Sequence, residues 1–405
     1  MGNTEQLFRD ISAGTVPGPP VFLSAKIADY RQRAMGHGSH ILQGGIPGDG
    51  AIILSSNDYL CLAANPVVTR AQADYLVEQG RGLMRSDVFR HELGPLASFE
   101  QRMAQWTGMP SALLTQSGWN ANVGLIQALA DKQVPVYLDM EAHMSLWEGT
   151  HSAQAKPRPF RHNSAQSLEN MLKRHGPGII AIDSVYSTSG SVAPLADMAE
   201  VSSRYGAILV VDESHSLGLF GPMGAGMVAA LNLQDQVDFI TASLSKTFAS
   251  RGGIIIGSSE NLEYFRYNAR PAIFSSSVMD HEAAGFLATQ EIVAGAALMR
   301  AELQAKADYL REGLAAAGYN VSASQSQIIS LVSGADGRTI RLRDVLEKRG
   351  VFGSVFCWPA TGRKRSLVRF SLHGNLTQSQ LDRVIDVCAE IAPEVEPQLW
   401  PVPRS

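Results

Sequence analysis

Cysteine is scarce in this chain of 405 residues, which contains only Cys61, Cys357 and Cys388. Three widely spaced cysteines form neither a disulfide framework nor a metal-binding motif, so we expect a reducing compartment and no metal. Long apolar runs are also lacking, since runs such as Ile208–Val211 are far too short to cross a bilayer. The first ten residues contain no apolar signal core. The sequence therefore predicts a soluble protein of the cytoplasm that does not act at a membrane.

The chain has no strong excess of charge of either sign, because its formal net charge is −4 and 18% of its residues are charged. That balance gives no reason to expect a nucleic-acid-binding surface. Apolar residues make up 45% of the sequence, which is typical of a globular enzyme rather than a disordered or fibrous protein. One short basic run, Arg363-Lys364-Arg365, is interpreted as a solvated loop, with an arm that binds an anionic substrate as the alternative.

Short apolar runs alternate with amphipathic segments of helix length between residues 110 and 260. The runs are Ala112–Leu114, Val136–Leu138, Ile179–Ile182, Ile208–Val211 and Gly253–Ile256. Strands that are apolar on both faces and separated by helices are typical of a parallel sheet. The sequence therefore predicts an α/β domain, and ligands of such sheets bind beyond the carboxyl ends of the strands.

The parts that flank this region have other patterns. Residues 1–50 are rich in Pro and Gly, with one short helix expected around Phe22–Arg33. A long helix is expected over about 285–317, where apolar residues recur at helical spacing up to Gly318. Strand-like runs follow it and indicate a smaller α+β domain. The expected division is an N-terminal segment (1–60), a large α/β domain (61–285) and a C-terminal domain (286–405).

Polar and ionisable residues follow four of the predicted strands, at the edge where a ligand is expected. They are Asp139 and His143; Asp183, Ser184 and Ser187; Asp212 and His215; and Thr241, Ser243, Ser245 and Lys246. Each residue alone has a structural explanation, as a buried histidine, a turn residue or a solvated lysine. Four such groups on one sheet edge favour a binding site.

One ligand, pyridoxal phosphate, accounts for the whole set. A lysine amine forms an imine with its aldehyde, and an acid pairs with its protonated pyridine nitrogen. Backbone N–H groups at the start of a helix hold a phosphate. Ser117-Gly118-Trp119 lies between an apolar strand and an apolar helix, and a glycine there lets the backbone approach the phosphate closely. The pattern thus predicts a cofactor site that includes this tripeptide, Asp212 and Lys246.

On these motifs the chain resembles the α-oxoamine synthases, fold-type I pyridoxal-phosphate enzymes that condense an amino acid with an acyl-CoA. The resemblance is carried by SNDYL (56–60), AHMSLWEG (142–149), VYSTSG (185–190), VDESHSLG (211–218), SLSK (243–246), FSSS (274–277) and LVRFSL (367–372). It implies an aspartate aminotransferase-like fold, in which a large domain around a mostly parallel seven-stranded sheet is joined to a smaller C-terminal α+β domain.

The resemblance also implies a role for each residue that matches a family motif. Lys246 would form the imine and act as general base, and Asp212 would pair with the pyridinium. His215 would contact the phenolic oxygen of the cofactor, and His143 would stack on its ring. The other cofactor contacts implied are Ser117, Gly118, Trp119, Ser187 and Ser243, together with Ser275 and Ser276 from the neighbouring subunit of a homodimer. Substrate contacts would come from Asn57, Thr361 and Arg369, with an ordinary surface arginine as the alternative for the last.

One segment departs from the family pattern. Ordinary members carry a glycine-rich segment where this chain has LMRSDVFRHELG (83–94), so substrates other than glycine or alanine are expected. A closer resemblance, carried by stretches such as QSGWNANVGL, RHGPGII and GVFGSVFCWPAT, is to the quorum-sensing autoinducer synthases of the CqsA type. It implies that a medium- or long-chain fatty acyl-CoA is joined to S-adenosylmethionine or 2-aminobutyrate, giving a long-chain α-aminoketone or α-hydroxyketone signal.

Three alternatives stay open on the sequence alone. An ordinary α-oxoamine synthase, of the 8-amino-7-oxononanoate synthase or 2-amino-3-ketobutyrate CoA ligase type, would use nearly the same chemistry. A pyridoxal-phosphate lyase or aminotransferase on the same fold would turn over the donor without acyl-CoA. A regulatory module that only binds the cofactor would be expected to carry a DNA-binding domain, and residues 1–50 show no helix-turn-helix or basic stripe. The donor and the acyl chain length also stay open.

Overall fold

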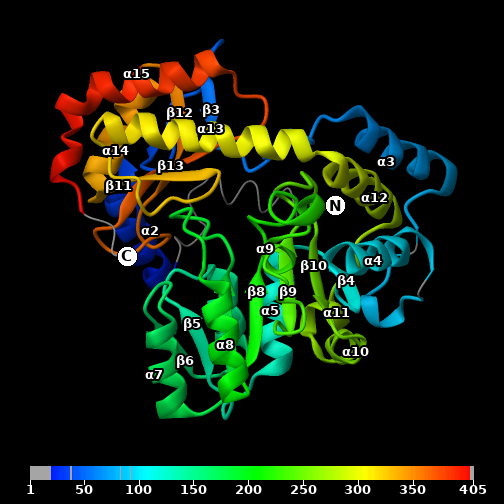
Figure 1. Cartoon of the computed structure of the whole chain (residues 1–405). Helices are drawn as coiled ribbons and strands as arrows, with labels where there is room; N and C mark the ends of the chain where they lie inside the picture. The colour runs from blue at the N-terminus through cyan, green and yellow to red at the C-terminus, as the bar shows by residue number, and fades with distance from the viewer. Residues whose placement is uncertain (1–19, 37–38, 83, 92, 402–405) are drawn as a thin grey trace, which may run out of the picture. The chain divides into compact units, whose positions relative to one another are not determined.

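The computed structural model describes residues 20–36, 39–82, 84–91 and 93–401 (Figure 1). Contacts divide the chain into a unit of residues 1–46 and a unit of residues 47–405. The first unit holds helix α2 (Val21–Ala34) and a two-stranded antiparallel ribbon of β1 (Met35–Gly36) and β2 (Ser39–His40). The helix predicted around Phe22–Arg33 is therefore confirmed, with one more residue at each end.

A seven-stranded sheet lies at the centre of the large unit, in the order β4-β10-β9-β8-β7-β5-β6. Every strand is parallel to the others except β10, which is antiparallel to both of its neighbours. The predicted mostly parallel sheet is thus confirmed. The strands are β4 (Ser111–Thr115), β5 (Val136–Asp139), β6 (Pro157–Phe160), β7 (Ile179–Asp183), β8 (Ile208–Asp212), β9 (Phe239–Ser243) and β10 (Gly253–Gly257).

Both faces of this sheet are covered by helices, which is why its strands are apolar throughout. Alternate strand residues point to opposite faces, so Val136 and Leu138 belong to one core cluster and Tyr137 to another. One face packs against α5 (Gly118–Leu129), α6 (Met144–Ser152), α10 (Ser259–Asn268) and α11 (Arg270–Phe274). The other packs against α4 (Gly94–Thr107), α7 (Ala165–His175), α8 (Leu195–Tyr205), α9 (Met227–Ala230) and α12 (Asp280–Gly295).

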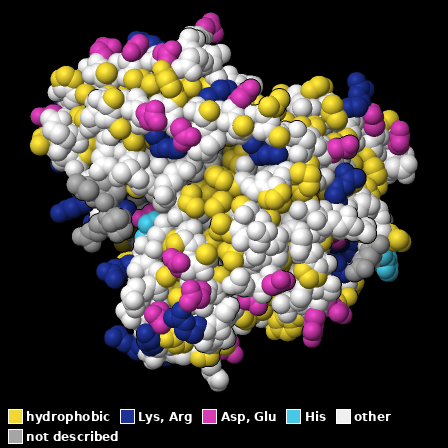
Figure 2. All heavy atoms as spheres, viewed as in Figure 1, with side chains coloured by type: hydrophobic (Ala, Val, Ile, Leu, Met, Phe, Trp, Pro, Cys, Tyr) yellow, Lys and Arg dark blue, Asp and Glu magenta, His cyan; other side chains and the backbone are white. Residues whose placement is uncertain are grey.

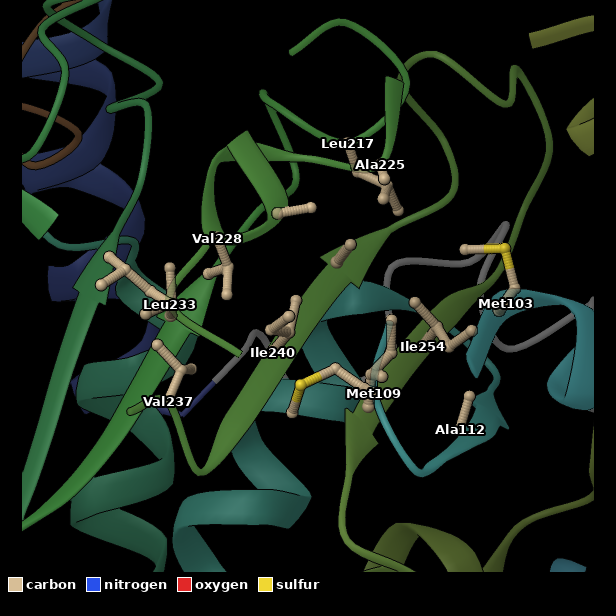
Figure 3. Packing of buried hydrophobic residues seen from close by; sticks show 14 of the residues in the cluster. Met103, Met109, Ala112, Leu217, Ala225, Val228, Leu233, Val237, Ile240 and Ile254 are labelled. Carbon is tan, nitrogen blue, oxygen red and sulfur yellow. The ribbon is translucent and has the colours of Figure 1, made fainter. Parts of the chain in front are cut away.

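Figure 3 shows part of this second face, where Ile240 of β9 and Ile254 of β10 pack among Met103, Met109 and Val228. The helix α3 (Pro66–Gln79) packs against α12. Two short 3-10 turns complete the region, η1 (Asp87–Phe89) and η2 (Pro222–Gly224).

A second, four-stranded sheet forms the core of the C-terminal part, in the order β11-β13-β12-β3. Its strands are β11 (Ile328–Gly334), β13 (Ser366–Ser371), β12 (Val351–Phe356) and β3 (Ile52–Leu54), and the last pairs in parallel with β12. It is accompanied by α13 (Ala297–Ala316), α14 (Asp336–Glu347) and α15 (Gln378–Val395), as Figure 1 shows. The turn η3 (Pro397–Leu399) follows α15. The predicted boundaries at residues 60 and 285 stay a prediction, although β3 shows that part of the N-terminal segment belongs to this sheet.

The single helix predicted over 285–317 is in fact two helices, α12 and α13. They are separated at Ala296, whose backbone angles (φ −82°, ψ 37°) are not helical. The preceding residue is Gly295. Glycine weakens a helix because it loses more backbone conformational freedom than any other residue when it becomes helical. The apolar stripe predicted for the second half is confirmed, since Leu303, Ala307, Leu310 and Leu314 are all buried. None of the helices in the described ranges has the length and hydropathy that a membrane span requires.

Charged side chains of both signs are interspersed on the face of the molecule shown in Figure 2. The basic run 363–365 is exposed, and two of its members have partners. Arg365 Nη1 lies 2.6 Å from Glu141 Oε1, and the guanidinium of Arg363 lies 5.3 Å from the ring centroid of Trp358. These contacts favour the interpretation of the run as a surface loop.

The segment 83–94, of which Leu83 and Glu92 lie outside the described residues, is held by a buried ionic cluster. Arg90 Nη2 lies 2.5 Å from Glu100 Oε1, and Arg90 Nε lies 3.3 Å from Asp87 Oδ1, with all three side chains at most 9% exposed. Burial raises the pKa of Asp87 to about 6, against the opposing effect of the Arg90 charge. Glu100 Oε1 also accepts a hydrogen bond from Leu114 N, at 2.8 Å, and so ties the cluster to β4.

The same segment is also anchored to residues 275–277. Ser277 N donates to the carbonyl of Arg85 at 2.8 Å, and Ser86 forms an isolated β-bridge with Ser276. The described residues of this segment are thus tied both at the backbone and by a buried ion cluster.

We predict that Arg90→Met lowers the free energy of unfolding by about 3–5 kcal/mol, because the substitution leaves two buried carboxyl groups without their nearest cation. The matched control is Arg204→Met, whose guanidinium pairs with Glu169 at 3.0 Å while half-exposed, and which should cost less than about 1 kcal/mol. Urea unfolding of both variants measures the difference. Equal losses in the two variants would show that the buried cluster does not hold the segment.

Candidate active site

The carboxyl ends of β7, β8 and β9 bring polar residues together at one sheet edge. Asp183 and Asp212 are direct neighbours across β7 and β8, and Asp212 is the neighbour of Thr241 across β8 and β9. Lys246 follows β9 in a turn, near enough to Asp212 for its pKa to respond to that charge. The structure therefore brings together the acid and the lysine that the sequence singled out.

Asp212 is a buried carboxylate, only 4% exposed. Its Oδ2 accepts a hydrogen bond from Asn122 Nδ2 at 2.6 Å, and its Oδ1 accepts one from Ser214 N at 2.8 Å. Within the part of the chain that the structure describes, no cation forms an ion pair with it. Two neutral donors stabilise a carboxylate without neutralising it, so Asp212 can bind a positively charged group.

Asn122 joins this acid to a histidine at the same edge. Its Nδ2 also donates to Ser145 Oγ at 2.9 Å, and Ser145 Oγ is hydrogen-bonded to His143 Nδ1 at 2.7 Å. Asn122 Oδ1 accepts a hydrogen bond from Thr241 Oγ1 at 2.6 Å. The sequence-based prediction did not include Asn122. The available signal was a polar residue on the buried face of an otherwise apolar helix.

The site lowers the pKa values of its lysine and its histidine. Burial lowers the pKa of Lys246, the charge of Asp212 opposes this effect, and the charge of Arg369 adds to it. The surrounding protein atoms likewise lower the pKa of His143, although the residue is partly exposed to solvent, and the charge of Asp212 opposes this effect. The ring of Trp119 lies edge-on to that of His143, with 6.2 Å between their centroids. A lysine with a lowered pKa is a better nucleophile near neutral pH.

His215 lies on the loop after β8 and is fully enclosed by protein. Its Nδ1 lies 2.6 Å from the hydroxyl oxygen of Tyr59, and its carbonyl oxygen accepts from Gln327 Nε2 at 2.9 Å. Burial lowers the pKa of His215 well below its usual value, and the nearby charges of Lys246 and Arg369 lower it further. Burial and these charges thus favour the neutral imidazole of His215.

The start of α5 forms a close-packed cradle against the ends of β9 and β10. A Cβ atom on Gly118 would lie 2.6 Å from Ser243 Cβ, and a Cβ on Gly253 would lie 2.3 Å from the carbonyl carbon of Ser117. Ser117 caps the helix, because its Oγ accepts from Asn120 N at 3.1 Å. The N–H groups of the first helical turn have no acceptor within the helix, and such a terminus binds phosphate.

These features together fit pyridoxal phosphate. The buried carboxylate of Asp212 lacks a cationic partner among the described residues, Lys246 has a lowered pKa beside it, and the glycine-lined helix start offers N–H groups. The carboxylate suits the pyridinium nitrogen of the cofactor, the lysine suits its aldehyde, and the helix start suits its phosphate.

Arg369 is 5% exposed, so the alternative of an ordinary surface arginine is wrong. Its Nη1 donates to the carbonyl of Ser187 at 2.7 Å, and its Nη2 donates to Asn57 Oδ1 at 3.1 Å. Its Nε is buried without a hydrogen-bond partner. The structure therefore joins Asn57, Ser187 and Arg369, and the effect of the Arg369 charge on the pKa of Lys246 places this group beside the lysine.

The remaining predicted site residues are less closely joined to this centre. Ser243 Oγ bonds to Ser245 Oγ at 2.7 Å, and Ser275 Oγ donates to the carbonyl of Pro271 at 2.6 Å. The carbonyl of Ser276 accepts from Gln116 Nε2 at 2.8 Å, next to the helix start. The Thr361 hydroxyl is buried without a hydrogen-bond partner, and no contact of the described residues joins it to Lys246.

The family model for aminotransferases of class I and II matches residues 49–387 of this chain. The chain is 42% identical over 382 residues to the CAI-1 autoinducer synthase of Vibrio campbellii, which covers 93% of this chain and 97% of that protein. It is 32% identical over 354 residues to an 8-amino-7-oxononanoate synthase of Anaeromyxobacter dehalogenans, covering 87% of this chain and 89% of that protein.

Solved structures show the same fold. A structure of SPT with PLP, which is pyridoxal phosphate, superposes with a TM-score of 0.80 at 28% identity, covering 86% of this chain and 88% of the other. The serine palmitoyltransferase of Sphingomonas wittichii superposes with a TM-score of 0.82 at 25% identity, covering 94% of this chain and 98% of the other. The fold predicted from the sequence is therefore confirmed as a fold-type I α/β architecture.

We predict that Asn122→Ala lowers the free energy of unfolding by about 1–3 kcal/mol, because it removes one hydrogen-bond partner from each of the buried groups of Asp212, Ser145 and Thr241. The affinity for pyridoxal phosphate should also fall, since the carboxylate is then held by one donor instead of two. Urea unfolding and a cofactor titration measure the two effects. The exposed Asn170 provides the control variant, Asn170→Ala. Unchanged stability and affinity in Asn122→Ala would contradict a supporting role for Asn122.

Proposed function

We propose a substrate class for this chain. The chain belongs to the aminotransferase class I and II family and, within it, to the α-oxoamine synthases. These enzymes are pyridoxal-phosphate-dependent acyltransferases. This chain joins a medium- or long-chain fatty acyl-CoA to an amino-acid-type donor, S-adenosylmethionine or 2-aminobutyrate. The product is a long-chain α-aminoketone that serves as an autoinducer or as its precursor. The observation that carries this proposal is the similarity to the CAI-1 autoinducer synthase over nearly the whole of both chains.

The residues at the sheet edge support an assignment of the cofactor contacts. Lys246 would hold pyridoxal phosphate through Nζ, and the buried Asp212 carboxylate would pair with its pyridine nitrogen. His143 would cover one face of the ring, and His215 would contact the phenolic oxygen. The phosphate would be held by the N–H groups of Gly118 and Trp119 and by the hydroxyls of Ser117, Ser187 and Ser243. When bound, the cofactor supplies an electron sink for the bond that breaks at the α-carbon of the donor.

The chain's own residues then position the donor and move its proton. Lys246 Nζ takes the proton from the donor α-carbon, which its lowered pKa favours near neutral pH. The buried guanidinium of Arg369, held in place by Asn57 and the Ser187 carbonyl, binds the donor carboxylate. Thr361, whose buried hydroxyl has no partner, contributes a further substrate contact.

The segment 83–94 presents exposed apolar side chains. Its described residues are held by Arg90 and by contacts with residues 276–277. Large apolar side chains on it, Met84, Phe89 and Leu93, are exposed, as is the neighbouring Phe274. Exposed apolar groups that gather in one region mark an interaction surface. We assign this surface to the homodimer interface, where Ser275 and Ser276 reach the phosphate of the partner subunit's site.

A product screen tests the substrate class directly. The purified protein and pyridoxal phosphate are incubated with acyl-CoAs of increasing chain length, each crossed with glycine, alanine, serine, 2-aminobutyrate and S-adenosylmethionine. We expect mass spectrometry to find a long-chain aminoketone with one of the last two donors. A product only from glycine, alanine or serine would place the enzyme in the ordinary metabolic branch. Donor turnover without acyl-CoA would favour the lyase or aminotransferase alternative.

We predict that Lys246→Ala abolishes condensation and prevents covalent attachment of the cofactor. Borohydride reduction followed by intact-protein mass spectrometry should show the added mass in the wild type and not in the variant, because Lys246 is the lysine of the described residues whose pKa responds to the Asp212 charge. The control is Lys173→Ala, which removes an exposed lysine paired with Glu169 at 3.1 Å. Attachment that persists in Lys246→Ala would contradict the assignment.

A further inference from the structure

Tyr59 and His215 are 156 positions apart in the sequence and form one of the shortest side-chain contacts of the site. The hydroxyl oxygen lies 2.6 Å from Nδ1, and the two rings meet edge-on with 6.1 Å between centroids. Both residues are buried. The Tyr59 carbonyl accepts from Gly374 N at 2.8 Å, so its backbone is tied to the C-terminal part of the chain.

Neither partner carries a charge in this contact. Burial raises the pKa of Tyr59 to about 12, so its hydroxyl keeps its proton. The charged groups that act on His215 are Lys246, Arg369 and His143, and all of them oppose a positive charge on the imidazole. A neutral imidazole has one N–H and one acceptor nitrogen. The contact therefore has a single proton between the oxygen and Nδ1.

The surroundings decide which of the two atoms donates. If Nδ1 carried the proton, the Tyr59 hydroxyl would need another acceptor, and its distance to Asn57 Oδ1 is 3.4 Å. The Gln327 side chain acts on Tyr59 as a donor, because its hydrogen bond lowers the pKa of Tyr59. Asn57 Oδ1 already accepts from Arg369 Nη2 at 3.1 Å and lies 3.4 Å from the Ser371 hydroxyl. A hydrogen bond at 3.4 Å is much weaker than one at 2.6 Å. The favoured arrangement has Tyr59 O–H donating to Nδ1.

We propose that Tyr59 is a positioning residue that holds His215 in the tautomer with its proton on Nε2. No partner for Nε2 is found in the described part of the chain, so this N–H is available to the cofactor. His215 thereby becomes a fixed donor to the anionic phenolic oxygen of pyridoxal phosphate. This inference rests on the proposed function, because it deepens the role assigned to His215 there.

The fixed tautomer has a chemical consequence. A hydrogen bond from Nε2–H stabilises negative charge on the phenolic oxygen. When that donor is lost or shared between two tautomers, the oxygen becomes more basic and holds the neighbouring proton more tightly. The pH-dependent absorbance change of the bound cofactor then moves to higher pH.

The experiment uses the holoenzyme labelled with 15N-histidine. Resonances of His215 are identified by their absence in His215→Gln. We expect the wild type to show a neutral imidazole with the proton on Nε2, and Tyr59→Phe to show a changed Nδ1 resonance with a mixture of tautomers. The midpoint of the absorbance titration should rise by about half a pH unit or more in Tyr59→Phe. The control is Tyr319→Phe, which removes a buried hydroxyl that donates to the Cys388 carbonyl at 2.9 Å.

Each result bears on a separate part of the inference. A proton on Nδ1 in the wild type, or a His215 signal that does not change in Tyr59→Phe, would overturn the role of Tyr59. A changed tautomer with an unmoved absorbance midpoint would overturn the contact between His215 and the phenolic oxygen. Neither measurement uses a substrate, so failure of the proposed acyl-CoA chemistry would be seen separately in the product screen.

Discussion

The buried carboxylate of Asp212 is the constraint around which this site is arranged. A carboxylate at the end of a covered strand is costly unless donors and a positive charge meet it. Asn122 and Ser214 supply the donors. The neighbouring carboxyl, Asp183, has a pKa well above its usual value, chiefly because of burial and secondly because of the Asp212 charge. The charged form of Asp183 is thus disfavoured beside Asp212, the acid that is proposed to pair with the pyridinium.

The cations of the site depend on this arrangement. Burial lowers the pKa of Lys246, the Asp212 charge opposes this effect, and the Arg369 charge adds to it. A lowered pKa suits the general-base role proposed for this lysine. Burial likewise lowers the pKa of His215, and the charges of Lys246 and Arg369 favour its neutral imidazole further. A neutral histidine can donate from one nitrogen only, and the Tyr59 contact selects which one. Electrostatics and one hydrogen bond thus act on the same side chain.

The segment 83–94 is the part of the chain that departs from the pattern of ordinary family members. Its ionic cluster ties it to β4 through Glu100 and Leu114, and β4 leads directly into the start of α5. Its exposed apolar side chains include Met84, Phe89 and Leu93, where a glycine-rich loop would present backbone. The residues proposed for catalysis lie outside this segment, at the edge of the sheet.

Much of this could be predicted from the sequence, because the signals are local. Apolar runs followed by polar residues indicated the parallel sheet, its ligand-binding edge, and the grouping of Asp212 with Lys246. The break at residue 296 was not predicted, because the apolar stripe of α13 continues the helical period of α12. The contacts of Asn122 and Tyr59 depended on tertiary structure, since each partner lies on an element far away in the chain. So did the burial of Arg369, because an alternating strand pattern does not say which face another domain covers. The sequence by itself determined which functional side chains follow the strands. The order of the strands and the packing of the second sheet decided which other side chains hold these functional side chains in place.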